Sequence, residues 1–130
     1  MREGPILIVE DDRDIREILT ETLQDSGFAV VTAVNGLDAL RVVRSLPLPP
    51  AVILLDLMMP VMDGYGFLEE RRKDTALAAI PVAIVTAGQS VERGRIGDEV
   101  RVVRKPIEMP LLRGVLDELR SEETEMPRSE

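Results

Sequence analysis

The sequence predicts an α/β fold with a mainly parallel sheet of five strands, covered by helices on both faces. Short apolar runs alternate five times with stretches of helical periodicity along the 130 residues, and this alternation is typical of repeated βαβ units. Most runs are apolar throughout, as in strands that are buried on both faces of a parallel sheet. The chain is also long enough for one domain with its own core.

The apolar runs define the predicted strands. They cover residues 5–9, 28–33, 51–55, 81–85 and 100–104. The last run alternates partly with polar residues, which predicts a strand at the edge of the sheet.

Five helices are predicted between and after these strands. The first ends before Gly27, and the others cover residues 37–46, 65–72, part of 89–97, and 111–119. Asp63 is a suitable N-cap for the third helix. The fourth helix is expected to be short and weak, because it contains glycines. Residues 73–80 are expected to be the frayed end of the third helix and a loop.

Five strands and five helices in this order predict a flavodoxin-like doubly wound sheet with the strand order 2-1-3-4-5. A closed barrel of strands and helices needs about 250 residues, many more than the chain has. We expect one domain over residues 1–120 and a charged, disordered tail over residues 121–130.

The composition excludes several classes of function. The chain contains neither cysteine nor histidine, which excludes disulfides, zinc–thiolate sites, Ser-His or Cys-His catalysis and a histidine phosphate carrier. The formal net charge of -8 opposes direct binding to nucleic acid. The sequence shows no signal peptide and no run of about 18 apolar residues, so we expect a cytoplasmic protein that does not insert into membranes.

The most informative stretch is residues 51–64, AVILLDLMMPVMDG. A buried apolar strand here ends in one carboxylate, Asp56. At the carboxyl end of a parallel strand, such a side chain leaves the core for the crevice in which α/β proteins bind ligands. A lone aspartate at a strand end is more often a turn or cap residue, but the sequence around Asp56 favours a reactive carboxylate.

Polar groups follow three other predicted strands at the same edge of the sheet, namely Glu10, Asp11, Asp12, Thr86 and Lys105. Carboxylates held close together repel one another by about 4 kcal/mol per pair at 4 Å and an effective dielectric constant near 20. A bound cation or a shifted pKa must relieve this repulsion. Hard oxygen ligands without histidine or cysteine favour Mg²⁺, with Mn²⁺ as an alternative. Together with the lysine and the threonine they suit a phosphoryl group, with Asp56 as the nucleophile.

Four motifs occur in order along the chain. They are Val9-Glu10-Asp11-Asp12, residues 56–64 (DLMMPVMDG), Thr86-Ala87 and Lys105-Pro106. With these motifs, roughly residues 4–120 resemble the response-regulator receiver domain of bacterial two-component signalling, which has the fold of the chemotaxis regulators. The second motif is highly specific. Because all four motifs occur in the same order as in the family, the probability of a chance match is very small.

The resemblance implies how the site works. Asp56 would accept a phosphoryl group from a phosphohistidine on a partner, either a sensor histidine kinase or a histidine phosphotransfer protein. Asp11, Asp56 and the backbone carbonyl of Met58 would ligate Mg²⁺, and Glu10 would act mostly through water. Thr86 would donate a hydrogen bond to the phosphoryl group, and Lys105 would pair with it.

Other residues have simpler interpretations. The Lys105–Pro106 peptide resembles a cis bond of the family. Asp12 falls at a position where the family varies. We interpret it as a solvated residue at a helix N-terminus rather than as a metal ligand. Asp63 is interpreted as a helix cap only. The methionines of the specific motif are interpreted as packing and turn residues rather than a soft-metal site.

Two features depart from the family pattern. The stretch between Thr86 and Lys105 is a few residues shorter than usual, and the shortage falls in the fourth helix and its flanking loop. Val102 occupies a position that is often Tyr or Phe, an aromatic that turns inward as the threonine engages phosphate. We expect the phosphorylation chemistry to tolerate both departures, whereas they bring the usual output face, from the fourth to the fifth helix, into question.

Four functions compete. We favour a phosphoacceptor receiver that switches or relays to a downstream protein target, and that is not an enzyme in the turnover sense. A degenerate receiver would be an interaction module that works without phosphorylation, but its site residues are intact. A hydrolase of the haloacid dehalogenase type needs an acid two residues after the nucleophile, where Met58 stands. A flavodoxin-type cofactor protein needs a phosphate-binding loop that the sequence lacks.

Overall fold

The computed structural model of the chain describes residues 2–87 and 90–121. Its centre is a sheet of five parallel strands in the predicted order β2-β1-β3-β4-β5. The strands are β1 (Ile6–Val9), β2 (Val30–Ala33), β3 (Val52–Leu55), β4 (Val82–Thr86) and β5 (Arg101–Arg104). The three central strands are buried along their whole length, which explains their apolar composition. Strand β5 exposes its first and last residues, as predicted for an edge strand.

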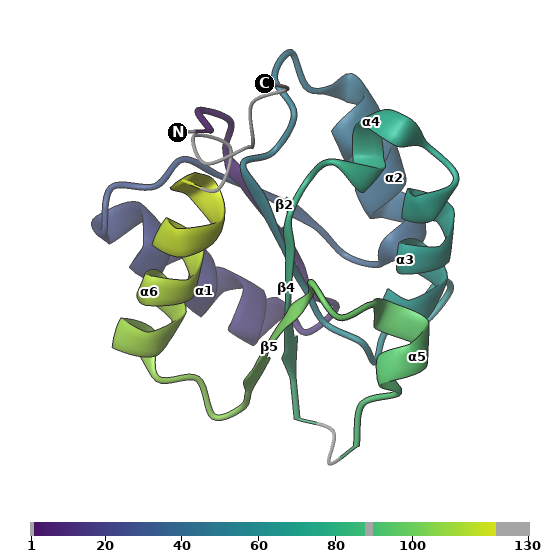
Figure 1. The fold of residues 1–130 in the computed structure, drawn as a ribbon. Helices are drawn as coiled ribbons and strands as arrows, with labels where there is room; N and C mark the ends of the chain where they lie inside the picture. Colours follow the sequence, from purple (N-terminus) through teal and green to yellow (C-terminus); the bar gives the residue numbers. More distant parts are fainter. Residues whose placement is uncertain (1, 88–89, 122–130) are drawn as a thin grey trace, which may run out of the picture.

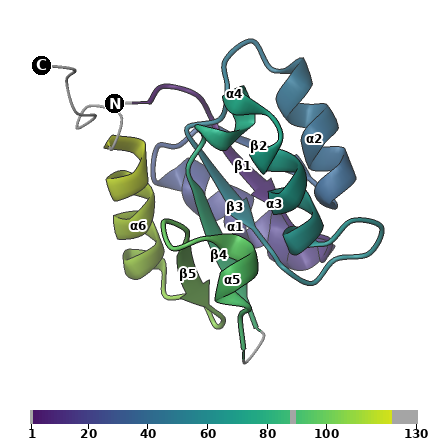
Figure 2. The ribbon, with the colours of Figure 1, turned by 45° about the vertical axis from the view of Figure 1, so that its right-hand side comes forward.

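Helices cover both faces of the sheet (Figures 1 and 2). On one face lie α1 (Arg13–Asp25) and α6 (Met109–Ser121), and on the other lie α2 (Gly36–Ser45), α3 (Gly64–Arg72), α4 (Thr75–Ala78) and α5 (Arg93–Ile96). Figure 1 shows the sheet nearly edge-on between these two groups. No helix within the described ranges is long and apolar enough to cross a membrane.

The sheet divides the hydrophobic core into two layers. Successive side chains of a strand point to opposite faces, so Leu7 and Val9 of β1 pack under α2 and α3, whereas Ile6 and Ile8 pack under α1 and α6. Phe67 of α3 is fully buried in the first layer. Full burial of such a side chain stabilises the folded state by roughly 1.5–3 kcal/mol. Because side chains are buried in this way on both faces of the sheet, the ends of the strands are held firmly in place.

The helices differ from the prediction in number. The described residues form six helices rather than five, because residues 75–78, predicted to be a loop, form the single turn α4. Asp74 caps this turn by accepting hydrogen bonds from the N–H groups of Ala76 at 3.0 Å and Leu77 at 3.3 Å, and Leu77 is buried. The short fourth helix of the prediction is confirmed as the single turn α5. Gln89 and the tail from residue 122 onward lie outside the described residues, and Ser121 still belongs to α6.

The register of the strands determines which polar residues become neighbours. Val9 pairs with Leu55, so the next residues, Glu10 and Asp56, leave the sheet side by side. Thr86 pairs with Arg104, so Lys105 follows directly beside the end of β4. A backbone hydrogen bond of 3.1 Å from the N–H of Asp56 to the carbonyl of Val9 fixes the first of these pairs.

We expect Gly64→Ala to reduce the free energy of unfolding by about 1–3 kcal/mol. Gly64 is the first residue of α3, and a Cβ atom there would lie 2.7 Å from the carbonyl oxygen of Asp56 and 2.8 Å from Cα of Leu57. These are backbone atoms, which cannot rotate away. Urea denaturation measures the change.

The matched control is Gly114→Ala in α6, where a Cβ atom meets nothing within 4 Å. Alanine favours a helix interior over glycine, so this variant is expected to gain about 0.5–1 kcal/mol. Equal stability of the two variants would contradict the close packing of α3 on the end of β3.

Candidate functional site

The acidic turn after β1 places one buried carboxylate beneath two exposed ones. Glu10 is only 3% exposed, whereas Asp11 and Asp12 are exposed. One carboxylate oxygen of Glu10 accepts a hydrogen bond from the N–H of Asp12 at 3.2 Å. Asp12 itself caps α1, since its Oδ1 accepts from the N–H of Ile15 at 3.0 Å. The interpretation of Asp12 as a helix N-terminus is thus confirmed.

Asp56 lies at the centre of the site. It is 7% exposed, and its Oδ1 accepts a hydrogen bond from the N–H of Met58 at 3.2 Å. Carboxylate oxygens of Glu10, Asp11 and Asp56 all lie within 4.8 Å of one another. The sheet edge therefore brings together the three acidic residues that the sequence predicts as a metal site.

Lys105 reaches across from the end of β5 to the same carboxylates. Its Nζ donates to Oε1 of Glu10 at 3.1 Å and lies 3.7 Å from Oδ2 of Asp56. The lysine side chain is 18% exposed, so water screens these pairs less than it would on an open surface. One ammonium group thus faces two of the three carboxylates. Its single positive charge does not balance the three carboxylates, so an excess of negative charge remains.

Burial and the charge of a neighbouring carboxylate both affect the pKa of Glu10. The pKa of Glu10 is raised from 4.5 to about 7, first by burial and second by the charge of Asp56, against the opposing effects of the Asp12 N–H and of Lys105. A divalent cation would remove the same penalty by pairing with the ionised oxygens. Three carboxylates at this spacing, with no softer ligand, fit Mg²⁺ or Mn²⁺.

The remaining predicted residues take up positions around this cluster. Thr86 is the last residue of β4 and is 1% exposed. The side chain of Met58 is 69% exposed and its N–H binds Asp56, while the role of its carbonyl as a metal ligand stays a prediction. Asp63 caps α3 by accepting from the N–H of Gly66 at 2.9 Å, as expected. The Lys105–Pro106 peptide is cis, also as expected.

Sequence reasoning missed the contribution of Arg16. Its Nη1 donates to the carbonyl of Glu10 at 2.8 Å and to that of Asp11 at 3.3 Å. The guanidinium group, which comes from the first part of α1, therefore stabilises the backbone of the acidic turn. Helical periodicity places Arg16 on the outer face of α1, and nothing in the pattern shows that the side chain folds back to the preceding turn.

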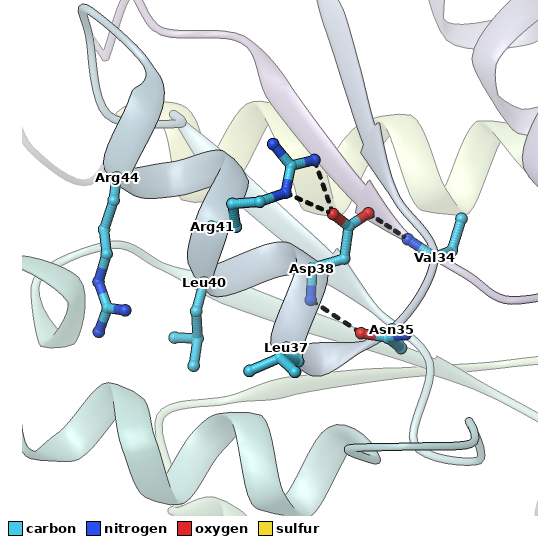
Figure 3. Close-up of a pocket in the computed structure, with 7 residues that line it drawn as sticks. All are labelled: Val34, Asn35, Leu37, Asp38, Leu40, Arg41 and Arg44. Atoms are coloured by element: carbon cyan, nitrogen blue, oxygen red, sulfur yellow. Dashed lines mark hydrogen bonds and ion pairs between the residues drawn. The ribbon is translucent and has the colours of Figure 1, made fainter.

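A hollow along α2 shares no residue with the acidic cluster (Figure 3). Asp38 is the acidic residue in its lining. Its carboxylate already binds Arg41 at 2.7 and 3.0 Å and accepts from the N–H of Val34 at 3.1 Å. The other lining residues are apolar, amide or basic side chains, so this hollow offers no alternative nucleophile to Asp56.

A family model described as the response regulator receiver domain matches residues 6–117. The chain belongs to this family. The match includes all the residues of the acidic cluster together with Thr86 and Lys105, and the receiver-domain fold agrees with the parallel sheet and its strand order.

This chain is similar in sequence and structure to known receiver domains. The signal receiver domain of a histidine kinase from Syntrophus aciditrophicus superposes with a TM-score of 0.82 at 30% identity and covers 98% of this chain and 96% of its own. Chemotaxis protein CheY4 of Vibrio cholerae has a TM-score of 0.79 at 29% identity, over 89% of this chain and 98% of its own.

Curated relatives share one part of their length with this receiver domain. Response regulator Rre1 of Synechocystis sp. is 36% identical over 97 residues, which are 74% of this chain and 39% of the relative. A protein of Pyropia yezoensis named "Probable transcriptional regulator ycf27" is 43% identical over 82 residues, 63% of this chain and 32% of the relative. The chain thus spans about a third of the length of these curated relatives.

We expect the metal-free receiver domain to lose stability as pH rises from about 4.5 to about 7. The folded state keeps a proton on Glu10 up to about pH 7, whereas an unfolded chain releases it near pH 4.5. Between these values the folded state binds more protons, so its free energy of unfolding falls with rising pH, by about 2 kcal/mol for this group. Urea denaturation at pH 5 and pH 8 measures the slope.

Other carboxylates titrate in the same range, so the comparison is with Glu10→Gln. This variant is expected to lack the part of the slope that belongs to Glu10. Saturating Mg²⁺ is expected to restore stability at pH 8 in the wild type, because the cation favours the ionised carboxylates. The same pH profile in both proteins would show that Glu10 does not hold the extra proton.

Proposed function

We propose that this receiver domain accepts a phosphoryl group on Asp56, with Mg²⁺, from the phosphohistidine of a partner protein. The observation that carries the proposal is the position of Asp56, which lies beside two further carboxylates and 3.7 Å from the Lys105 ammonium group. A carboxylate is a weak nucleophile toward a negatively charged phosphoryl group. It becomes effective where positive charge neutralises the transferred group and holds it in line.

The chain's own residues divide this work. A carboxylate oxygen of Asp56 forms the new bond to phosphorus as the bond to the histidine nitrogen breaks, and the released imidazole takes up a proton. Lys105 lies within reach of the oxygens of the transferred group, and the buried Thr86 at the end of β4 supplies a hydroxyl donor. Mg²⁺ held by Asp11 and Asp56 would neutralise the remaining charge. Water later attacks the phosphorus of the acyl phosphate, which releases inorganic phosphate and restores the carboxylate.

The domain acts as a switch or relay rather than as an enzyme in the turnover sense, because its own Asp56 is the group that is phosphorylated. The 130 residues contain no histidine, so the donor histidine and any recipient histidine lie outside this receiver domain. A sensor histidine kinase or a histidine phosphotransfer protein fits the donor role. The output is an altered affinity for a downstream protein target, and the net charge of -8 disfavours direct contact with nucleic acid.

The main alternative is a degenerate receiver that binds its target without phosphorylation. The single-turn α5 and the aliphatic Val102 favour it, since both lie on the route by which other receivers transmit the signal. The cluster of Glu10, Asp11, Asp56 and Lys105 argues against it, because a repulsive cluster of this kind is costly to keep without a use. A hydrolase of the haloacid dehalogenase type is disfavoured, because the exposed Met58 has no acidic group.

Incubation with Mg²⁺ and acetyl phosphate or phosphoramidate is expected to add one phosphoryl group, seen by intact mass spectrometry. Asp56→Ala removes the nucleophile and EDTA removes the metal, so each should abolish the adduct. A mass gain that survives in Asp56→Ala would place the acceptor elsewhere. No gain with either small donor would favour the degenerate receiver.

The two exposed aspartates of the acidic turn provide a sharper test of the metal site. Asp11→Asn removes a carboxylate from the cluster, so the Mg²⁺ concentration for half-maximal phosphorylation is expected to rise at least tenfold. Asp12→Asn is the matched control, because asparagine caps a helix as well as aspartate does. It is expected to leave the Mg²⁺ requirement within about twofold. Equal effects of both variants would mean that general surface charge, rather than ligation, sets the requirement.

A further inference from the structure

Helix α5 is too short to be stable by itself. It has four residues, and its N-cap residue Glu92 makes no side-chain capping hydrogen bond. Isolated helices of fewer than about 12 residues are marginal in water. The position of α5 must therefore be set by contacts with neighbouring elements, and one side chain inside it, Ile96, is buried at 1% exposure.

Those contacts come mainly from α3, which lies directly beside α5 (Figures 1 and 2). The hydroxyl oxygen of Tyr65 accepts a hydrogen bond from the N–H of Glu92 at 3.0 Å. The Arg95 guanidinium carbon lies 4.4 Å from the centre of the Tyr65 ring, and Arg95 forms an ion pair of 3.1 Å with Glu69. Arg72 donates to the carbonyl of Arg95.

Tyr65 differs from the other contacts because it lies at the start of α3, next to the segment that follows Asp56. It is the second residue of α3 and is 7% exposed. The residue before it, Gly64, donates a hydrogen bond of 2.9 Å to the carbonyl of Leu57, which directly follows Asp56. A short connected path therefore leads from Asp56 through Leu57, Gly64 and Tyr65 to the N–H group of Glu92, the N-cap residue of α5.

The β5 position that is often aromatic in receivers offers no comparable link here. Val102 is half-buried and packs against the core on the α2–α5 side of the sheet. It has no hydroxyl group and no ring that could move between two positions beside β4. The chain thus has no aromatic residue at position 102 of β5. Its buried tyrosine, Tyr65, lies instead on α3, the helix beside α5.

We propose that Tyr65 is a positioning residue that couples the charge state of Asp56 to the position of α5 through its hydrogen bond to Glu92. The proposal rests on phosphorylation of Asp56 as its input. A change in the turn between β3 and α3 moves the start of α3, and the Tyr65 hydroxyl transmits that movement to α5. The exposed surface of α3 and α5 then becomes the part of the domain that differs between its two states.

The test is Tyr65→Phe, which removes the hydroxyl and keeps the ring beneath Arg95. Amide NMR spectra are recorded with Mg²⁺ and with or without beryllofluoride, which mimics a phosphoryl group on a carboxylate. In the wild type we expect shifts at residues 57–59 and also at residues 92–97. In Tyr65→Phe we expect unchanged binding and unchanged shifts at residues 57–59, while the shifts at residues 92–97 fall at least twofold.

A control variant separates coupling from looser packing of α5. Arg95→Gln removes the ring contact and the ion pair to Glu69 but leaves the Tyr65 hydroxyl in place, so it is expected to keep the shifts at residues 92–97. Full-sized shifts in Tyr65→Phe, an equal loss in both variants, or no shift at residues 92–97 in the wild type would each overturn the coupling role alone. A wild type without shifts at residues 57–59 would overturn the phosphoacceptor function and the coupling together.

Discussion

The repulsion among Glu10, Asp11 and Asp56 is the constraint on which the rest of the site depends. Their carboxylate oxygens lie within 4.8 Å of one another, and like charges at such distances oppose folding. Lys105 offsets only part of this repulsion. Without a cation, burial and the charge of Asp56 raise the pKa of Glu10 to about 7, and a proton on this group lowers the repulsion. A bound cation would lower the same repulsion without that proton. The excess of negative charge among these residues is therefore suited to a divalent cation.

The parallel sheet is what makes such an imbalance possible. Carboxylates repel one another, so they stay within 4.8 Å only if a stronger force fixes their backbones. That force is the burial of the central strands, where β1, β3 and β4 are buried at every residue. A register slip of one residue in β1 would turn its buried set toward the other face and would separate Glu10 from Asp56. Hydrophobic packing on both faces thus maintains an electrostatic arrangement that is unfavourable by itself.

The sequence was informative wherever a residue's role follows from its place along one strand or turn. Strand order, the acidic cluster, Lys105 and the caps at Asp12 and Asp63 could be predicted, because each depends on which residue ends an apolar run or begins a helix. The contacts of Arg16 with the acidic turn and the hydrogen bond from Glu92 to Tyr65 could not. Both depend on where a long side chain turns after leaving its helix, and periodicity gives the face of a residue but not the partner of its terminal atoms. Helix α4 was missed for another reason, since four residues are too few to show a helical period.

The short α5 shows how a shortened connection can change the way a fold carries a signal. A longer helix would have its orientation set by its own packing against the sheet, whereas one turn adopts the orientation that its neighbours impose. Here the neighbour is α3, through Tyr65, Glu69 and Arg72. Because α3 begins at Gly64, whose N–H donates to the carbonyl of Leu57, the element that holds α5 is also bonded to the segment that directly follows the acceptor. The shortened segment therefore moves the link between site and surface from the edge strand β5 to the start of α3.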